Sequence, residues 1–174
     1  MARKPLKAFR QTPGLCGPAS LKILMTHYGK EFTEGEMANL CTATADDGAD
    51  HSGMMRAAER LGHKPIAMSN ASIKDIQWFL DQDVPVIIGW WSDHGEAGDH
   101  FSVVYDIEGD IIKMMDPELD AGIREMKIEE FKKVWFDFDG KENVQVKRWM
   151  MAIPSVDDDT VKPLLSPQQK NLTK

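Results

Sequence analysis

The order of the helical and strand-like segments constrains the fold of this chain more than any other feature. In the first half, apolar residues recur in segments that start with helix-capping patterns and stop at glycines. In the second half, short runs rich in β-branched and aromatic residues are separated by Gly and Asp. Because the helices come first and the strands follow, the sequence predicts an α+β fold with a helical half followed by an antiparallel sheet.

Start and stop signals delimit four predicted helices. A proline in a first turn, Ser or Thr followed three residues later by an acidic residue, and glycines after a last turn mark their ends. The predicted helices cover residues 18–28, 34–40, 52–61 and 73–82. Strands are predicted at residues 84–91, 100–107, 110–116 and 146–154, and the sequence is compatible with a further strand at 122–126 and a short helix at 128–136.

Composition and charge narrow the class of protein. Of 174 residues, 42% are apolar, which is enough for one core, and the net charge of −7 argues against a nucleic-acid partner. The longest apolar run, VPVIIGWW, is too short to span a bilayer, and no apolar stretch follows the basic N-terminus as a signal peptide requires. We therefore expect a cytoplasmic protein without a membrane partner, one domain over residues 1–154, and a polar tail over residues 155–174.

One of the two cysteines, Cys16, stands where a polar loop becomes an apolar helix, with Gly14 and Gly17 close on either side. A helix N-terminus stabilises a thiolate, and the glycines leave the sulfur accessible. Gln11, five residues earlier, can donate its amide N–H together with the backbone N–H of Cys16, which would form an oxyanion hole. The alternative is that Cys16 is buried filler, as we expect for Cys41 in the second helix.

The second half of the chain offers a base and a carboxylate for such a nucleophile. His100 begins a predicted strand, and Asp116 ends the next one. A three-residue hairpin loop at 107–109, with Gly109 in a left-handed conformation, would place His100 directly opposite Asp116 at hydrogen-bonding distance. Each residue also has a simpler explanation, as a polar strand end and as part of a turn with Pro117. Their joint occurrence favours a Cys-His-Asp arrangement.

The segments QTPGLCGPA, DHF and DP together resemble the C39-type cysteine peptidases of the papain-like superfamily, over residues 11–120. The resemblance implies a papain-like fold, with a helical half that carries the cysteine and a sheet half that carries the histidine and the aspartate. It implies that Cys16 is the nucleophile, His100 the base, Asp116 the orienting acid and Gln11 the oxyanion donor. It also implies a peptide or protein substrate, and we expect no cofactor.

The loop from Trp90 to His100 has two interpretations. It holds four potential metal ligands, His94, Glu96, Asp99 and His100. Two glycines make the segment flexible and the ligands lack a helical spacing, so we favour a substrate-covering flap without a metal. We assign substrate contacts to three residues of this loop and to one neighbour of the nucleophile: Trp90, Trp91, Asp99 and Gly17. The alternative for the tryptophans is burial in the core, or one on each face of the sheet.

Three functions remain open from the sequence. The leading hypothesis is a cysteine peptidase, in which a thiolate attacks a peptide carbonyl and the imidazolium protonates the leaving amine. A papain-like acyltransferase or deamidase would use the same three groups with a different acceptor or leaving group. A non-catalytic peptide-binding module is the third possibility, but such a module has no need of a nucleophile, a base and an acid together.

Overall fold

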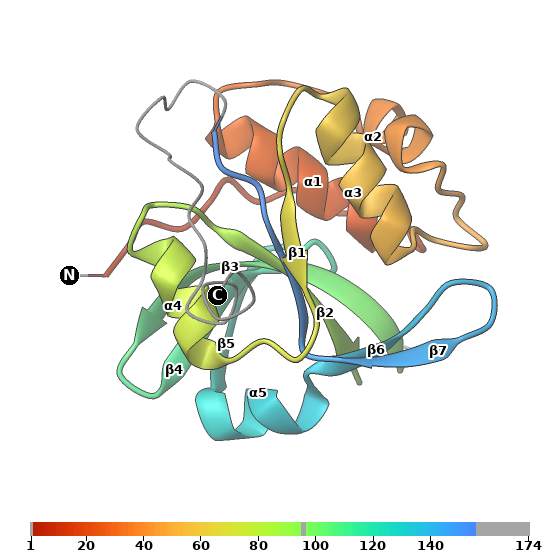
Figure 1. Ribbon diagram of the computed structural model, residues 1–174. Coiled ribbons are helices and arrows are strands. Elements are labelled where there is room, and N and C mark those ends of the chain that lie inside the picture. The colour runs from red at the N-terminus through yellow and green to blue at the C-terminus, as the bar shows by residue number, and fades with distance from the viewer. Residues whose placement is uncertain (1, 95–96, 156–174) are drawn as a thin grey trace, which may run out of the picture.

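The computed structural model describes residues 2–94 and 97–155 of the chain. The helices are α1 (Cys16–His27), α2 (Glu34–Cys41), α3 (His51–Arg60), α4 (Ile73–Leu80) and α5 (Ile128–Val134). In Figure 1, α1, α2 and α3 lie together above the central sheet, and α5 lies below it. The upper helices come from the first part of the chain, as the sequence predicts.

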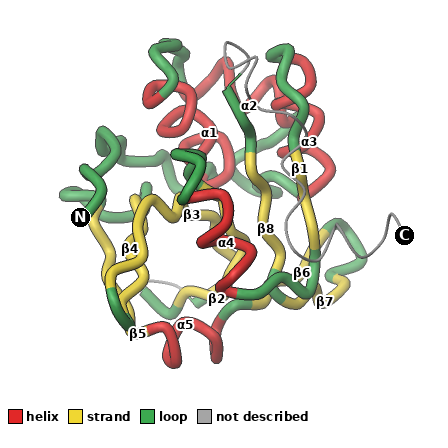
Figure 2. The backbone as a smooth tube through the Cα atoms, turned by 60° about the vertical axis from the view of Figure 1, so that its left-hand side comes forward, coloured by secondary structure: helices red, strands yellow, loops and turns green. Residues whose placement is uncertain are grey.

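The described strands form an antiparallel six-stranded sheet and a separate hairpin, and Figure 2 shows their paths. The sheet has the order β1-β8-β2-β3-β4-β5, so β2 and β3 lie at its centre. The hairpin of β6 and β7 extends from the sheet, and β6 packs against β2 and β3. The strands are β1 (Ile66–Met68), β2 (Val86–Ser92), β3 (Gly98–Glu108), β4 (Ile111–Met115), β5 (Ile123–Lys127), β6 (Phe136–Asp139), β7 (Val144–Lys147) and β8 (Trp149–Ala152).

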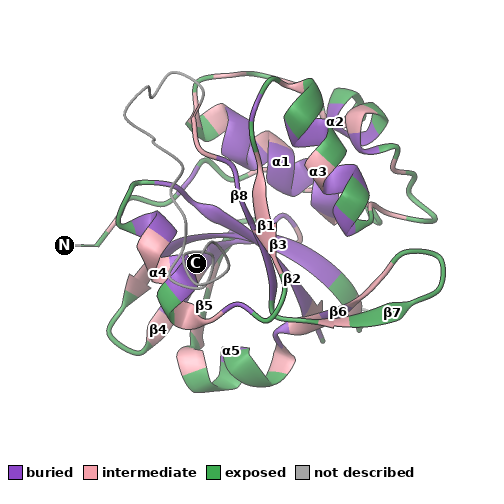
Figure 3. Cartoon of the chain, in the orientation of Figure 1, coloured by how far each residue is buried: buried purple, intermediate pink, exposed green. Residues whose placement is uncertain are grey.

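Each face of the sheet buries its own apolar cluster. Leu24 of α1 and Met54 of α3 belong to the cluster on one face, while Phe79 of α4 and Phe131 of α5 belong to the other. Figure 3 shows the central strands and the inward sides of α1 and α3 as buried. A fully buried side chain of this size contributes about 1.5–3 kcal/mol to folding. The first cluster fixes α1 against β3, which is the arrangement that positions Cys16 near the sheet.

Local signals predicted the helices well. The capping boxes of Thr33 with Glu36 and of Ser72 with Asp75 are both present, at the starts of α2 and α4. The first helix begins at Cys16, two residues before the predicted start, so the cysteine is itself the first helical residue. Cys41 is 2% exposed in the core, as predicted. Of the predicted tail, residues 156–174 lie outside the described residues.

β1 and β6 were not predicted from the sequence, and the single strand predicted over 146–154 is divided into β7 and β8 at Arg148, whose φ is +53°. β1 has only three residues, all of them half-buried, so it carries no alternation of apolar and polar positions. The predicted short helix over 128–136 ends at Val134, because Phe136 already belongs to β6. These strands take their structure from pairing with distant segments, such as β1 with β8, rather than from local preference.

The hairpin between β3 and β4 differs from the predicted one. Glu108 pairs with Ile111, so the turn contains two residues, Gly109 and Asp110, instead of three. Gly109 does adopt a positive φ of 61°, as predicted. A β-bulge at Tyr105 then shifts the register by one residue farther along the two strands.

The bulge brings His100 and Asp116 to the same face of the sheet. Val103 pairs with Met115, and continuing this register places Ser102 opposite Asp116. The predicted direct opposition of His100 and Asp116 is therefore wrong, and the two are diagonal neighbours within side-chain reach. Without the bulge, Asp116 would lie opposite Val103, whose side chain points to the other face.

None of the helices in the described part of the chain is both long enough and apolar enough to cross a bilayer. The expected cytoplasmic location stays a prediction.

Candidate active site

Cys16 lies at a helix N-terminus whose hydrogen-bonding groups are not used by a side-chain cap. It is the first residue of α1, and the N-cap residue Leu15 makes no side-chain cap hydrogen bond. No acidic residue lies in the first turn to compensate the positive end of the helix. The cysteine is half-buried, so its thiol is accessible from one side. This end of α1 can therefore stabilise negative charge on the sulfur or on a bound substrate.

The structure requires a glycine at both positions near Cys16. Gly14 has a φ of +86°, and a Cβ at this position would collide with the carbonyl oxygen of Ala45. Gly17 was expected to contact substrate, but it is buried. A Cβ on Gly17 would lie 2.9 Å from the Met54 sulfur, so this glycine allows α1 to pack closely against α3. The assignment of Gly17 to substrate binding is wrong.

His100 connects the cysteine to a buried carboxylate. Its Nε2 lies 2.6 Å from Oδ1 of Asp116, and Cys16 lies close enough to the ring to raise the pKa of His100. Because Asp116 occupies Nε2, Nδ1 is the ring nitrogen that is left for Cys16. Burial lowers the pKa of His100, but the hydrogen bonds and charges of Asp116 and Cys16 outweigh burial and raise the pKa to about 10. The imidazole is therefore held in its charged form at neutral pH.

Asp116 is fully buried and has three hydrogen-bond donors around it. Besides His100, the backbone N–H of Glu118 donates to Oδ1 at 2.9 Å, and Arg124 Nε donates to Oδ2 at 2.6 Å. Burial raises the pKa of Asp116, but the hydrogen bond and charge of His100, with help from the other donors, hold that pKa below its usual range. The carboxylate is thus ionised and fixed in direction.

The sequence analysis missed Arg124, although its strand was foreseen. Arg124 comes from β5 and also lies over the ring of Trp90, with 5.3 Å between the guanidinium carbon and the ring centroid. Its Nη2 is buried without a hydrogen-bond partner among the described residues. An arginine inside a predicted strand, facing the strand that ends in Asp116, is the signal that pointed to this contact.

Gln11 lies in the same cleft, but no short hydrogen bond fixes the orientation of its side-chain amide. Its Nε2 makes a long contact of 3.5 Å with the carbonyl oxygen of Thr12, and its Oε1 is buried without a described partner. The backbone N–H of Gln11 donates to the carbonyl oxygen of Pro117 at 2.8 Å, which ties this loop to the turn after Asp116. The amide can therefore turn toward a substrate at small cost.

The two tryptophans of β2 do not line the cleft. Trp90 is 2% exposed and donates its indole N–H to Ser102 Oγ at 3.0 Å, in the core beneath His100. Its assignment as a substrate wall is wrong, because it packs edge-on against the His100 ring instead. Trp91 is half-buried and stacks on Phe136, so strand alternation places the two rings on opposite faces. Neither ring is among the residues that line the cleft.

The cleft between the helices and the sheet has a volume of about 1320 Å³ and includes Gln11, Cys16, His100 and Asp99. Asp99, which the sequence analysis assigned to substrate binding, is exposed here and accepts a hydrogen bond from the Phe138 N–H at 2.7 Å. The described cleft thus contains the predicted nucleophile, base and oxyanion donor together with one of the four predicted substrate contacts.

A second histidine, His51, forms a buried cluster farther along the same cleft. Its Nε2 lies 2.6 Å from Asp137 Oδ2, and its Nδ1 lies 3.6 Å from Asp139 Oδ2. The ring stacks on Trp149 at 4.1 Å between centroids. This cluster joins α3 to β6, and the sequence analysis missed it because β6 itself was not foreseen.

A metal ion has little to bind in this cleft. Within the described residues, the one group of three potential ligands that lie within 4.8 Å of one another is His100, Asp116 and Glu118. The first two already pair with each other and with Arg124, which competes with a cation. Of the ligands considered for the loop, Glu96 lies outside the described residues, and His94 is exposed.

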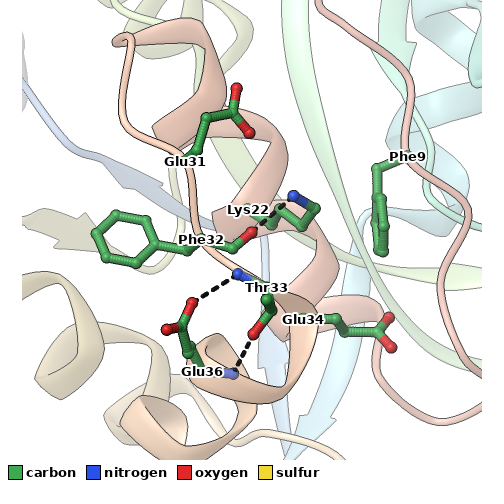
Figure 4. Close-up of a pocket in the computed structure, with 7 residues that line it drawn as sticks. All are labelled: Phe9, Lys22, Glu31, Phe32, Thr33, Glu34 and Glu36. Carbon is green, nitrogen blue, oxygen red and sulfur yellow. Dashed lines mark hydrogen bonds between the residues drawn. The ribbon is translucent and has the colours of Figure 1, made fainter.

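A second, smaller hollow lies near α1 and α2 and contains none of the predicted catalytic residues (Figure 4). Lys22 donates to the carbonyl oxygen of Phe32 at 2.6 Å, and the capping box of Thr33 and Glu36 occupies the remaining wall. These polar groups stabilise the start of α2, so we assign the hollow a structural role.

Comparison with known proteins places the chain in a family. The sequence pattern of the peptidase C39 family matches residues 10–138. The chain belongs to the peptidase C39 family. This membership makes the chain a cysteine peptidase, and it confirms the family resemblance found from the sequence.

A curated relative is the Lactococcin-G-processing and transport ATP-binding protein LagD of Lactococcus lactis subsp. lactis. The two are 29% identical over 127 residues, which is 73% of this chain. The chain spans 17% of the length of LagD, so the similarity concerns one part of that protein.

Solved structures of peptidase domains share the fold. The peptidase domain of Streptococcus ComA, a bi-functional ABC transporter, superposes with a TM-score of 0.69 at 20% identity, covering 87% of this chain and 100% of that domain. A C39-like peptidase from Bacillus anthracis gives 0.63 at 16% identity, covering 86% and 94%. A double glycine motif protease, solved with its leader peptide, gives 0.64 at 19% identity, covering 88% and 94%. The papain-like α+β fold predicted from the sequence is confirmed.

Proposed function

We propose that this chain hydrolyses peptide bonds with Cys16 as nucleophile, His100 as acid and base, and Asp116 as the group that orients His100. The observation that carries the proposal is the continuous chain of contacts in which His100 meets Cys16 on one side and Asp116 on the other. The raised pKa of His100 supports it, because the imidazolium is the acid that the leaving amine needs.

The reaction proceeds in two balanced steps. The Cys16 thiolate attacks the carbonyl carbon of the scissile bond, the C–N bond breaks, and the His100 imidazolium gives its proton to the departing amine. The acyl group is then a thioester on Cys16. Neutral His100 takes a proton from water, the hydroxide oxygen attacks the thioester carbonyl, and the carboxylic acid leaves as the thiolate–imidazolium pair is restored.

The negative oxygen of each tetrahedral intermediate needs hydrogen-bond donors. The backbone N–H of Cys16 at the uncapped end of α1 is the first donor, and the Nε2 of Gln11 is the second. The long contact of Gln11 with Thr12 supports this role, since a weakly held amide can reorient when an oxyanion forms.

We propose a peptide as the substrate. Support comes from a structural relative that was solved with a leader peptide and from a curated relative whose name describes lactococcin processing. The open cleft of about 1320 Å³ is large enough for several residues of an extended peptide.

The test is to incubate a library of proteome-derived peptides with the wild-type chain and with Cys16→Ala, followed by mass spectrometry of the products. Hydrolysis predicts pairs of shorter peptides with new N-termini, present only with the wild type. Acyl transfer predicts ligated or amine-adduct masses, and deamidation predicts a gain of about 1 Da. A wild-type library without any of these Cys16-dependent products would contradict the proposal.

A further inference from the structure

The cleft that contains Cys16 is strongly acidic. Among the described residues that line it, seven are acidic and three are basic. The basic residues are Arg10, Arg56 and Lys141, and Arg10 is paired with Asp120 at 3.8 Å. The acidic residues are Asp46, Asp47, Asp50, Asp99, Glu118, Asp137 and Asp139. A cleft with this excess attracts cations and disfavours acidic peptides.

Three of these carboxylates lie close together beside β6, and the basic side chain that pairs with two of them is a histidine. Asp99 comes from β3, and Asp137 and Asp139 come from β6. Among the described residues, His51 is the basic side chain that pairs with the last two. Whether His51 is neutral or protonated, the cluster carries excess negative charge.

One carboxylate of the cluster has an oxygen atom without a hydrogen-bond donor among the described residues. Asp137 is 2% exposed, and its Oδ1 is buried with no hydrogen-bond partner among the described residues, while Oδ2 pairs with His51. A buried oxygen of an ionised group normally has a donor, because leaving it without one costs about 1–3 kcal/mol. A cation at Asp99 and Asp139, in front of Asp137, would offset this cost.

The neighbouring aromatic ring suits the stem of a long basic side chain. Phe138 lies between Asp137 and Asp139 in sequence and lines the cleft. Its ring meets Trp91 edge-on at 5.7 Å, which fixes its position. Asp99 lies next to Phe138, because its carboxylate accepts the Phe138 N–H, and an aromatic face at this point accommodates the methylene groups of Lys or Arg and attracts the charged end. A bare metal ion would not use this surface, and the cluster does not bring three ligand atoms within 4.8 Å of one another.

We propose that Asp99, Asp139 and Phe138, backed by Asp137, form a subsite for a lysine or arginine side chain of the peptide substrate. The inference rests on the proposed peptidase function and names the class of peptide that the site selects. Asp99 and Asp139 contact the cation directly, Phe138 contacts its stem, and Asp137 contributes through its charge.

The experiment uses a proteome digested by a protease that cuts after aromatic residues and leucine, so that Lys and Arg remain inside the peptides. Cleavage sites that depend on Cys16 are aligned on the scissile bond, and Lys or Arg is expected to be enriched at one fixed position. Matched peptides with Lys, norleucine or Glu at that position then give kcat/KM values. We expect Lys to exceed norleucine by roughly tenfold, equivalent to about 1.4 kcal/mol.

Asp99→Asn is the central variant, because Asn keeps the acceptor for the Phe138 N–H and removes the charge. The preference for Lys should fall severalfold in Asp99→Asn, and further in Asp99→Asn with Asp139→Asn. The matched control is Glu59→Gln, which removes one charge from an exposed position of α3 outside the cleft. An unchanged preference in the double variant, or no enriched position, would overturn the subsite.

A binding measurement separates this inference from the peptidase proposal. Cys16→Ala is titrated with fluorescein-labelled decapeptides of alternating Gly and Lys or alternating Gly and Glu. Tighter binding of the Lys peptide, lost in the double variant, supports the subsite even where the wild type cuts no peptide, which would defeat the peptidase proposal alone. Equal binding of both peptides by a chain that does hydrolyse peptides defeats the subsite and leaves the peptidase proposal intact.

Discussion

Two buried histidine–aspartate pairs occur in the same cleft, and they differ in what the second ring nitrogen meets. His100 and His51 are both 6% exposed, and each has an Nε2 that lies 2.6 Å from an aspartate oxygen. The remaining nitrogen of His100 faces the thiol of Cys16, whereas that of His51 faces a second carboxylate, Asp139. A histidine–aspartate pair therefore becomes a candidate catalytic group only where the other nitrogen can exchange a proton with a nucleophile or a substrate.

The surroundings of the two histidine rings also differ, since one ring is fixed by packing and the other is open to the cleft. His51 is stacked on Trp149 and packs edge-on against Phe101, so its ring is fixed between the helical layer and the sheet. His100 lies at the start of β3 beside the uncapped end of α1, with one side open to the cleft. The first pair joins two parts of the fold, and the second can carry a proton between a nucleophile and a substrate.

The largest expected effect separates the two cysteines. Cys16→Ala should abolish peptide hydrolysis, a loss of about 10⁴-fold or more, since no other group replaces the nucleophile. Cys41→Ala is the matched control, because Cys41 is buried in the core and contributes only packing. It should lower the melting temperature and leave hydrolysis in place. If Cys16→Ala hydrolyses peptides at a rate comparable to that of the wild type, Cys16 is not the nucleophile.

The two aspartates provide the next comparison. Asp116→Asn keeps the shape but loses the charge that holds the imidazolium, so kcat should fall by roughly 10³-fold. Asp137→Asn should instead reduce the free energy of unfolding. On a peptide with no basic residue, the kcat of this variant should stay within a few tenths of the wild-type value. The readouts are kcat on that neutral peptide and thermal unfolding. Equal losses of kcat in both variants would show that the pairs are not functionally distinct.

His51→Ala should mainly reduce the stability of the fold, whereas His100→Ala should mainly reduce the activity. Removing one member of a buried pair leaves a carboxylate without its partner and costs about 3–5 kcal/mol. The loss should appear in denaturant unfolding of His51→Ala. For His100→Ala we expect near-complete loss of hydrolysis, and retained folding is checked in the same assay.

Gln11→Ala should reduce turnover by roughly 10²-fold, the usual effect of one oxyanion donor. The rate of Cys16 alkylation by iodoacetamide should stay nearly unchanged, because alkylation forms no oxyanion. If Gln11→Ala hydrolyses peptides as fast as the wild type, Gln11 is a loop residue and another donor completes the oxyanion hole.

Arg124→Gln should have the smallest effect, a loss of about threefold to tenfold in kcat, because it loosens Asp116 without removing it. A loosened Asp116 makes a weaker hydrogen bond to His100, and this bond raises the pKa of His100, so the alkaline limit of activity should also move downward. Arg124→Lys should restore part of the rate and the original limit. A purely structural arginine would change unfolding without moving the pH profile.

Sequence reasoning predicted the parts of this site that depend on local signals. The position of Cys16 at a helix N-terminus, the caps of α2 and α4 and the positive φ of Gly109 follow from a few adjacent residues. The contact of His100 with Asp116 was predicted for an incorrect reason, because a bulge at Tyr105 replaces the longer turn. Arg124 and the His51 cluster depend on pairing between distant strands, which the sequence does not encode locally.

The selectivity of alkylation tests the central claim most directly, namely that Cys16 and His100 act as an ion pair. Cys41 is an internal reference, because burial raises its pKa to about 12. With His100 holding its proton up to about pH 10, we predict that iodoacetamide labels Cys16 far faster than Cys41 at pH 7, and that His100→Ala slows the labelling of Cys16. Labelling of Cys16 that is equally fast in the wild type and in His100→Ala would contradict the account.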